Sequence, residues 1–373
     1  MKKFELKKID SETQARCGEL LTPHGTVQTP VFMPVGTRGT VKGLTPAQLE
    51  QTNASIILAN TYHLLLRPGV EIVESLGGLH KMMAWNGPIL TDSGGYQVFS
   101  LSSLNRIGED SVEFASHIDG SRIVLDAKIA TRVQNRLGAD IIMCFDECAP
   151  YPCERARLKK AVERTIRWAA QCKEAHENPK QMLFGIIQGG IEQDLRQHCV
   201  EAMIPMDFDG YALGGLSVGE GHENMAKTVD STAPLLPPNK PRYLMGVGMP
   251  ADIVAAVRAG VDMFDCVLPT RNGRNAYVFT SNGPMRMRNS SYQTDPDPIE
   301  ADCPCYACRH FSRASIRHFF NVSEMLGPIL VSIHNLVYYQ RLMQEIRDRI
   351  KDGSFGTWSR EFIEKHKTEA KNL

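Results

Sequence analysis

Eight short apolar segments recur along the chain, and helical stretches lie between several of them. The segments are residues 30–35, 55–60, 88–92, 140–146, 182–188, 210–214, 242–247 and 263–268. Most are continuous apolar runs, which is typical of strands buried on both faces. The helical stretches are residues 126–137, 154–176, 193–203, 223–232 and 250–259. This alternation indicates parallel βαβ units and predicts an α/β fold, a (β/α)8 TIM-type barrel with insertions.

Three further segments complete the predicted architecture. Residues 1–28 are polar and turn-rich, and we expect them to form a small antiparallel cap. The connection 93–122 is long for a βα loop, which predicts an insertion. A long helix from about residue 329 to 351 follows a cluster of cysteines. We therefore predict a capped catalytic barrel over residues 1–300 and a C-terminal zinc-binding helical subdomain, packed on the barrel, over 301–373.

The cysteine cluster has the spacing of a metal site. Cys303, Cys305 and Cys308 form a Cys-x-Cys-x-x-Cys motif, and His334 follows on the predicted long helix. Three thiolates and one imidazole complete a tetrahedral Zn2+ site with no coordination position for water. The sequence therefore predicts one structural zinc per chain. Three free thiols and an unrelated histidine are the alternative.

Several of the predicted strands end in polar or glycine residues. In a barrel of this class, catalytic residues lie where strands end and βα loops begin. Glycines at such positions let the backbone approach a ligand closely. The strand-end residues are Asp92-Ser93-Gly94-Gly95, Asp146-Glu147-Cys148, Gln188-Gly189-Gly190, Gly214-Gly215, Gly246-Val247-Gly248 and Asp265.

Composition limits the possible partners. The 373-residue chain has 42 Lys and Arg residues and 42 Asp and Glu residues, so no overall field attracts a polyanion. Arginines nevertheless gather late, and a solvated basic surface is the alternative to an RNA-binding one. The ten cysteines, the absence of a signal peptide and the absence of a membrane-length apolar run predict a cytoplasmic protein that contacts no membrane.

Five motifs then identify a resemblance. They are DSGGYQ at 92–97, FDE at 145–147, GIIQGG at 185–190, GGLSVG at 214–219 and DMFDCVLPTR at 262–271. Together with the cysteine cluster they resemble bacterial tRNA-guanine transglycosylases, of the queuine tRNA-ribosyltransferase family, from about residue 5 to the C-terminus. That family has a (β/α)8 barrel and a zinc subdomain, which agrees with the pattern prediction.

The resemblance implies base exchange on an intact tRNA strand. Guanine at the wobble position of tRNAs for Asp, Asn, His and Tyr, which have GUN anticodons, is replaced by 7-aminomethyl-7-deazaguanine (preQ1) in queuosine biosynthesis. By similarity Asp265 is the nucleophile that forms a covalent ribosyl-aspartate intermediate. Asp92 is by similarity the general acid and base, which protonates the departing guanine and deprotonates the incoming base.

The resemblance also assigns the base pocket. Asp146 accepts from the N1 and N2 hydrogens of guanine, Gln188 and the Gly215 N–H donate toward O6, and the Leu216 carbonyl receives the ammonium of preQ1. Ser93 adds a polar contact, and Tyr96 and Met245 sandwich the ring, although core packing is the alternative for these two. Val218 and Cys148 match residues typical of the bacterial pocket, which predicts preQ1 and not the larger queuine as substrate.

Partners follow from the same resemblance. Arg271 and Arg274, directly after the last predicted strand, are placed to hold phosphates or the uridines beside the target guanine. The family implies a homodimer. The sequence only hints at this through Tyr338, Tyr339 and Trp85, for which a core position is the simpler expectation.

Three other functions compete with this interpretation. A noncatalytic RNA-binding subunit is the principal alternative, and the presence of both Asp92 and Asp265 argues against it. The archaeal branch of the superfamily typically carries further C-terminal RNA-binding domains, for which we expect no room after His334. A zinc hydrolase would need an open metal site at the strand ends, and none stands out.

Overall fold

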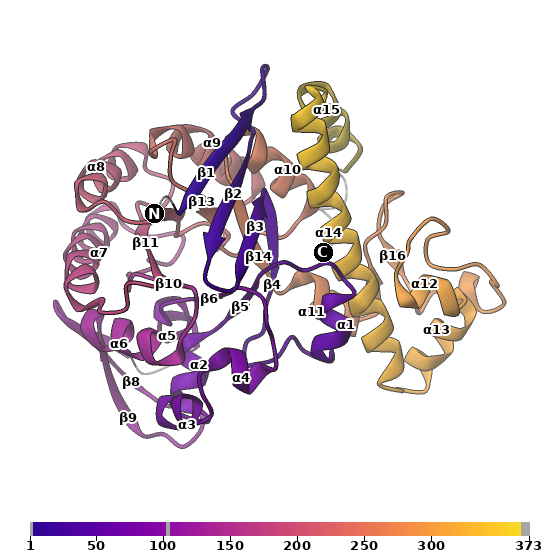
Figure 1. The fold of residues 1–373 in the computed structure, drawn as a ribbon, viewed down its shortest axis with the longest axis horizontal. Helices are drawn as coiled ribbons and strands as arrows, with labels where there is room; N and C mark the ends of the chain where they lie inside the picture. Colours follow the sequence, from indigo (N-terminus) through magenta and orange to yellow (C-terminus); the bar gives the residue numbers. More distant parts are fainter. Residues whose placement is uncertain (1–2, 102–104, 367–373) are drawn as a thin grey trace.

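The centre of the molecule is a parallel sheet of eight strands closed into a barrel (Figure 1). The computed structural model describes residues 3–101 and 105–366. In spatial order the strands are β4 (Val31–Pro34), β14 (Met263–Cys266), β13 (Arg242–Leu244), β12 (Gly210–Leu213), β11 (Met182–Ile187), β10 (Ile141–Met143), β6 (Ile89–Thr91) and β5 (Ile57–Ala59). A parallel bridge between Val35 and Leu58 joins the first strand to the last. The predicted (β/α)8 barrel is confirmed.

Side chains of each barrel strand alternate between two apolar clusters. In β11, Met182, Phe184 and Ile186 belong to the cluster inside the barrel, whereas Leu183 and Ile187 pack outward with the helices. This follows from the two-residue period of a strand, which points successive side chains to opposite faces. Because both faces are buried, the strands read as continuous apolar runs in the sequence.

Helices occupy the connections between the strands. The predicted helices are confirmed as α6 (Ala127–Leu137), α7 (Arg155–Ala175), α8 (Gln193–Met203), α9 (His222–Thr232) and α10 (Pro250–Arg258). Shorter elements complete the barrel: α1 (Pro46–Glu50), α2 (Thr61–Leu66), α3 (Val70–Ser75), α4 (Leu79–Met83), α5 (Gly95–Leu101), η1 (Ile204–Met206), η2 (Ala233–Leu235) and α11 (Leu268–Arg274).

The helix ends follow local sequence rules. Asp126 begins α6 because its Oδ1 accepts the N–H of Ile129 at 2.6 Å, and Gly138 ends the helix with a φ of 79°. These are an N-cap side chain and a left-handed glycine that satisfy the terminal backbone groups. Thr45 and Gln48 form a capping box at the start of α1.

The expected antiparallel cap is present at the N-terminus. It consists of β1 (Phe4–Ile9), β2 (Arg16–Thr22) and β3 (Gly25–Thr29). Phe4, Leu20 and Val27 join the apolar cluster inside the barrel, so this sheet covers the end of the barrel where the strands begin. The predicted insertion, residues 93–122, contributes to a second antiparallel sheet of β7 (Asn105–Ile107), β8 (Ser111–Ala115) and β9 (Arg122–Asp126), which extends beyond the predicted end.

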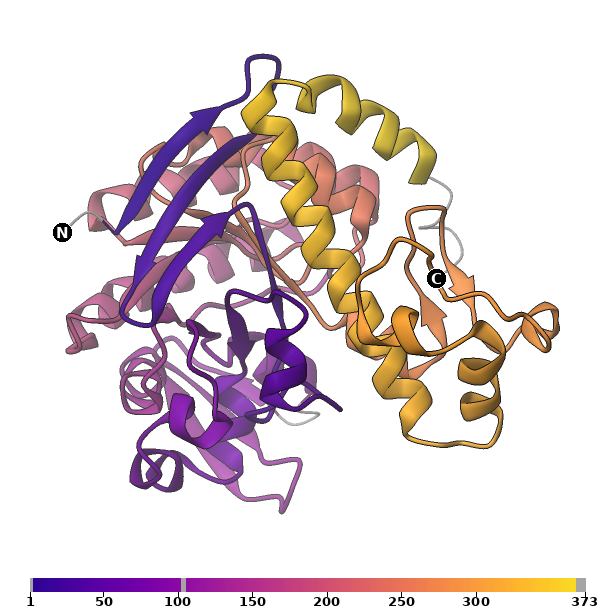
Figure 2. The same cartoon turned by 45° about the vertical axis from the view of Figure 1, so that its right-hand side comes forward.

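The C-terminal part combines a small lobe with a long helix (Figure 2). The lobe contains β15 (Tyr277–Val278), β16 (Met285–Arg286), η3 (Ser290–Tyr292), α12 (Tyr306–His310) and α13 (Arg313–Asn321), followed by α14 (Leu326–Asp352) and α15 (Phe355–His366). From the lobe, α14 runs along the barrel, where Gln340 Nε2 donates to the Phe32 carbonyl at 3.1 Å. The predicted division between residues 300 and 301 stays a prediction.

The three aromatic residues considered for an interface are buried in the chain itself. Trp85, Tyr338 and Tyr339 are each less than a tenth exposed, as expected for core positions. Among the helices of residues 3–101 and 105–366, none has the length and apolar character needed to cross a membrane.

Candidate active site

A cavity of about 620 Å³ opens where the barrel strands end. Asp92 directly follows β6, Gln188 directly follows β11, and Asp265 lies within β14. The structure therefore brings together residues that are far apart in the sequence. The predicted residues that line the cavity are Asp92, Ser93, Tyr96, Asp146, Gln188, Gly215, Leu216, Met245, Asp265 and Arg271.

Asp265 is held through one of its carboxylate oxygens. Its Oδ1 accepts the hydroxyl of Tyr243 at 2.6 Å and the N–H of Gly246 at 2.8 Å. Within the described part of the chain, Oδ2 accepts no such hydrogen bond. Burial raises the pKa of Asp265, while the contacts from Tyr243 and Gly246 lower it. The carboxylate is therefore oriented, with one oxygen available to a substrate.

Asp92 lies in a network of hydrogen-bond donors. Its Oδ1 accepts the N–H of Thr61 at 2.8 Å, and its Oδ2 accepts the amides of Asn60 at 2.5 Å and Gln97 at 2.8 Å. Burial nevertheless raises the pKa of Asp92 to about 6, and the nearby charge of Asp265 adds to this shift. A carboxyl group that titrates near neutral pH can both give and take a proton.

Asp146 and Gln188 form a polar pair in the same cavity. Gln188 Nε2 donates to Asp146 Oδ2 at 2.7 Å, and the Ser93 hydroxyl lies 3.4 Å from Asp146 Oδ1. Burial raises the pKa of Asp146 to about 6. A carboxylate beside an amide offers acceptors and a donor side by side, which suits the edge of a purine-like base.

Gly215 allows the backbone to pass close to this pair. Its φ is +66°, and a Cβ built on it would lie 2.3 Å from Gln188 Oε1. An L-residue here would both strain the backbone and displace the amide. The sequence therefore needs glycine at this strand end for the polar pair to keep its position.

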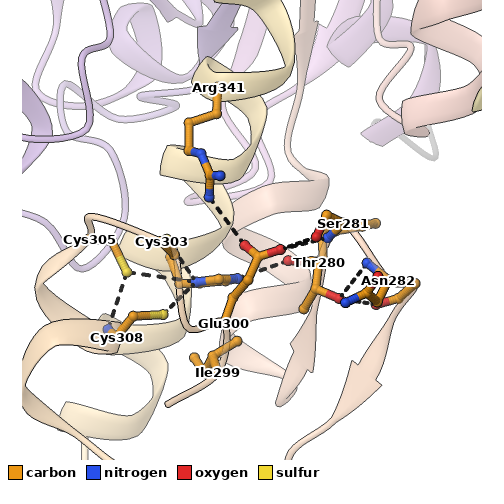
Figure 3. A network of polar contacts seen from close by, with 12 residues as sticks. Thr280, Ser281, Asn282, Ile299, Glu300, Cys303, Cys305, Cys308 and Arg341 are labelled. Atoms are coloured by element: carbon orange, nitrogen blue, oxygen red, sulfur yellow. Dashed lines mark hydrogen bonds and ion pairs between the residues drawn. The ribbon is translucent and has the colours of Figure 1, made fainter. Parts of the chain in front are cut away.

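The predicted metal ligands converge in the C-terminal lobe (Figure 3). The Sγ atoms of Cys303, Cys305 and Cys308 lie 3.6, 3.7 and 3.3 Å from His334 Nδ1. In a tetrahedral zinc site such atoms are about 3.6 Å apart, since Zn–S and Zn–N bonds are about 2.3 and 2.1 Å. His334 Nε2 donates to the Phe279 carbonyl at 2.9 Å, which leaves Nδ1 as the ligand atom. The four side chains fit one metal ion.

Comparisons of the sequence with known proteins point to a single family. A family profile described as Queuine tRNA-ribosyltransferase matches residues 10–368. Proteins named queuine tRNA-ribosyltransferase are similar over nearly their whole length. That of Halothermothrix orenii is 53% identical over 98% of both chains, and that of Syntrophobacter fumaroxidans is 54% identical over 96% of both.

The chain belongs to the queuine tRNA-ribosyltransferase family. It is a pentosyltransferase, a tRNA-guanine transglycosylase that acts on tRNA and a guanine-type base. The resemblance identified from the motifs is thus confirmed, and an enzyme is favoured over the noncatalytic RNA-binding subunit. In this family member, Asp92 and Asp265 both line the cavity at the strand ends.

The predicted RNA-binding arginines occupy different environments. Both lie on α11, directly after β14. Arg271 is exposed and lines the cavity, whereas Arg274 is partly buried and is not among the lining residues. Burial lowers the pKa of the Arg274 guanidinium. Of the two arginines, Arg271 therefore has the more direct access to the cavity.

The two residues predicted to select between preQ1 and queuine also lie in this cavity. Val218 and Cys148 both line the cavity. Burial raises the pKa of the Cys148 thiol to about 12, so this sulfur stays protonated and acts as an apolar wall. Tyr96 is 52% exposed, in contrast to a core position, and Met245 is partly buried against the cluster inside the barrel.

Sequence reasoning missed the residues that hold the two aspartates. Tyr243 and Gly246 contact Asp265, and Asn60 and Gln97 contact Asp92. Asn60 offered a signal, because it directly follows β5 as Asp92 follows β6. Tyr243 offered none, since a tyrosine within a strand is typical of ordinary packing.

Proposed function

We propose that this transglycosylase replaces guanine at the wobble position of tRNAs with GUN anticodons, those for Asp, Asn, His and Tyr, by preQ1. The single observation that carries this proposal is that Asp92 and Asp265 line one cavity at the carboxyl ends of the strands. Base exchange on an intact strand needs a carboxylate nucleophile and a second group that moves protons, and two different environments supply them.

Asp265 is the nucleophile in this proposal. Its Oδ2 attacks the anomeric carbon as the bond to guanine breaks, and a ribosyl ester forms. The electron pair of the broken bond goes to the leaving base. Tyr243 and Gly246 support this role, because two donors on Oδ1 fix the carboxylate and leave Oδ2 to react. The incoming base then attacks the same carbon and releases the carboxylate.

Asp92 is the general acid and general base in this proposal. It protonates departing guanine and later removes a proton from the incoming base. The raised pKa, about 6, supports this role, because both protonation states are accessible near neutral pH. The donors from Asn60, Thr61 and Gln97 keep the carboxyl group in place throughout the exchange.

Asp146 and Gln188 recognise the base through hydrogen bonds in this proposal. Ionised Asp146 accepts from the N1 and N2 hydrogens, a donor pair that adenine lacks. Gln188 and the Gly215 N–H donate toward O6, for which the Gln188 amide must be shared with Asp146, its partner at 2.7 Å. Ser93 adds a polar contact, and Tyr96 and Met245 enclose the ring faces.

Three residues favour preQ1 over queuine. The Leu216 carbonyl receives the ammonium of the aminomethyl group. Val218 and Cys148 limit the space beside the base, and both line the cavity. Incorporation of free queuine as readily as preQ1 would contradict this part of the proposal.

Arg271 and Arg274 bind the tRNA around the target nucleotide. Their position on α11, next to the nucleophile strand, supports this role. Arg271→Ala and Arg274→Ala should chiefly raise KM for tRNA, and more so for Arg271, which lines the cavity. Unchanged tRNA kinetics in both variants would count against the placement.

The metal of the C-terminal lobe is zinc in this proposal, and its role is structural. The donor set of Cys303, Cys305, Cys308 and His334 fits tetrahedral Zn2+, and four protein ligands leave no position for a reacting water. The enzyme also forms a homodimer and works in the cytoplasm, which suits its ten cysteines, since none of them forms a disulfide. Light scattering of the purified protein tests the dimer.

The test of the proposed reaction is incorporation of labelled guanine into an unmodified tRNA of the Tyr or Asp type. Wild type should incorporate label, and Asp265→Ala should not. A folded, zinc-replete wild type that incorporates no label would favour an RNA-binding or partner-dependent protein. Equal incorporation by both proteins would keep the reaction and move the nucleophile elsewhere.

A further inference from the structure

A second group of metal-ligating side chains lies at the opposite end of the barrel. His24, His80 and Asp140 each place one ligand atom within 4.8 Å of the other two. His24 lies in the loop between β2 and β3, His80 lies on α4, and Asp140 directly precedes β10. The group therefore joins the N-terminal cap, the β5–β6 connection and the start of a barrel strand.

The distances within this group are close to those between ligands of a shared ion. His24 Nδ1 lies 2.8 Å from Asp140 Oδ1, and His80 Nε2 lies 3.1 Å from Asp140 Oδ2. Ligand atoms that share one ion are about 3.0–3.5 Å apart, because each bond is about 2.1 Å long. The 3.1 Å pair lies within this range, whereas the 2.8 Å pair is at hydrogen-bond distance and lengthens when an ion binds. We propose that His24, His80 and Asp140 form a second metal site, for a divalent cation of borderline softness such as Zn2+ or Ni2+. Two imidazoles and a carboxylate are a donor set that such ions prefer.

Asp140 is rigidly placed for this role. Its side chain is 1% exposed, and its Oδ2 accepts the N–H of Ile89 at 2.9 Å. Its backbone pairs on both sides, with Ile89 and with Met182, at 2.8 Å each. A fixed, buried carboxylate provides a preformed anionic ligand, and the presence of two imidazoles lowers its pKa although burial raises it.

The histidines differ in how freely they move. Their rings stack with centroids 3.6 Å apart and an angle of 17° between the planes. One ion cannot lie in the planes of two parallel rings, so binding requires one ring to turn out of the stack. The His24 side chain is 40% exposed on a hairpin loop, whereas that of His80 is 14% exposed on a helix. His24 is the ring that turns, and each ligand nitrogen gives up its proton to the other ring nitrogen or to water.

The ion would fasten the cap to the barrel. Because the site joins three elements only in the folded chain, binding stabilises the native state by mass action. It lies at the end of the barrel away from the cavity, so its ligands take no part in base exchange. The proposed ion thus stabilises the folded enzyme and takes no part in catalysis.

Nickel titration of the untagged, zinc-replete enzyme tests the proposal. Calorimetry should detect an additional bound Ni2+ in wild type, and Ni2+ should raise the melting temperature. His24→Gln and His80→Gln should each weaken this binding by about tenfold or more, since each removes one of three ligands. His198→Gln is the matched control, because His198 pairs with Glu163 at 2.9 Å and has no second imidazole.

Folding and binding are separated in the same experiment. His24→Gln changes an exposed loop residue and should retain guanine exchange, which shows that the variant is folded. If His80→Gln fails to fold, His24→Gln alone decides. Wild type that binds no Ni2+ beyond the cysteine site, or binding that is equal in wild type and His24→Gln, would overturn the proposal.

Discussion

At the scale of single residues, the proposed function depends on how burial and hydrogen bonds set the protonation of three carboxyl groups. Asp92, Asp146 and Asp265 have raised pKa values because the cavity removes them from water. The strand-end pattern in the sequence was enough to find all three. Their partners were not predictable, because the contact between Tyr243 and Asp265 depends on the pairing of β13 with β14.

Tyr243→Phe should impair the chemical step. The change removes one of two donors to Asp265 Oδ1, so the carboxylate loses its fixed orientation. We expect kcat to fall by about tenfold or more, because a charge-assisted hydrogen bond contributes about 1.5–3 kcal/mol. The acid limb of the rate profile should also move to higher pH, since the Tyr243 contact lowers the pKa of Asp265.

Steady-state kinetics across a pH series measure both effects. Tyr211→Phe is the matched control, because Tyr211 is a buried tyrosine of the neighbouring strand whose hydroxyl lies 3.5 Å from the Ile204 carbonyl, away from the carboxyl groups of the cavity. Wild-type kcat and an unmoved acid limb in Tyr243→Phe would contradict this positioning role.

Guanine binding should weaken as the pH falls through about 6. Burial raises the pKa of Asp146 to about 6, so this carboxylate takes up a proton in that range, well above the usual range of an aspartate. Protonated Asp146 no longer accepts from both N–H groups of the base. Calorimetric binding of guanine to the enzyme alone, between pH 5 and 8, isolates this step from catalysis. Affinity that stays constant down to pH 5 would be inconsistent with the assignment.

At the scale of elements, the barrel could be predicted from the hydrophobic patterns of its strands and longer helices. The cavity residues lie where the strand patterns end. The predicted strand 140–146 is shorter in the structure, where β10 spans Ile141–Met143 and the flanking backbones of Asp140 and Cys144 still hydrogen-bond to neighbouring strands. The helices α6 to α10 were predictable because each is long enough to show a helical pattern of apolar residues in the sequence. The short helices α2, α3 and α4 have fewer than two turns, so their sequences carry little periodicity.

The cap is joined to the barrel by a buried ion pair. Arg16 of β2 donates through Nε to Asp262 Oδ1 at 3.0 Å, and its other nitrogens donate to the carbonyls of Pro238 and Lys240. Arg16→Ala would leave Asp262 buried without its charge partner, which costs about 3–5 kcal/mol. Urea unfolding measures this loss.

The control for this prediction is another arginine that pairs with a carboxylate. Arg360 is exposed and lies 3.4 Å from Glu12, so Arg360→Ala should change the free energy of unfolding by about 0.5 kcal/mol or less. Similar losses in Arg16→Ala and Arg360→Ala would show that the buried pair has no special role.

At the scale of the whole molecule, the metal lobe and the barrel are connected through α14. This helix carries His334, and its later residues contact β4 through Gln340. Loss of zinc should therefore destabilise both the lobe and the packing of α14 against the barrel. The ligand set was predictable from spacing, whereas the path of α14 along the barrel was not, because it depends on long-range packing.

Cys305→Ser should lower zinc content, lower the melting temperature and raise KM for tRNA, with guanine affinity kept. The reason is that the ligands lie in the lobe, whereas the base residues lie at the strand ends of the barrel. Metal analysis, thermal unfolding and kinetics measure the three effects, with Cys153→Ser as a control outside the cluster. Normal tRNA affinity after complete, verified removal of zinc would refute the structural role.

The central claim is that Asp265 carries the ribose between the two bases. It is tested most directly by quenching the enzyme on an unmodified tRNA of the Tyr type, isolating the protein–RNA adduct under denaturing conditions and mapping it by mass spectrometry. The account predicts a ribosyl adduct on Asp265 in wild type and none in Asp265→Asn. An adduct on another residue, or base exchange by Asp265→Asn at the wild-type rate, would contradict it.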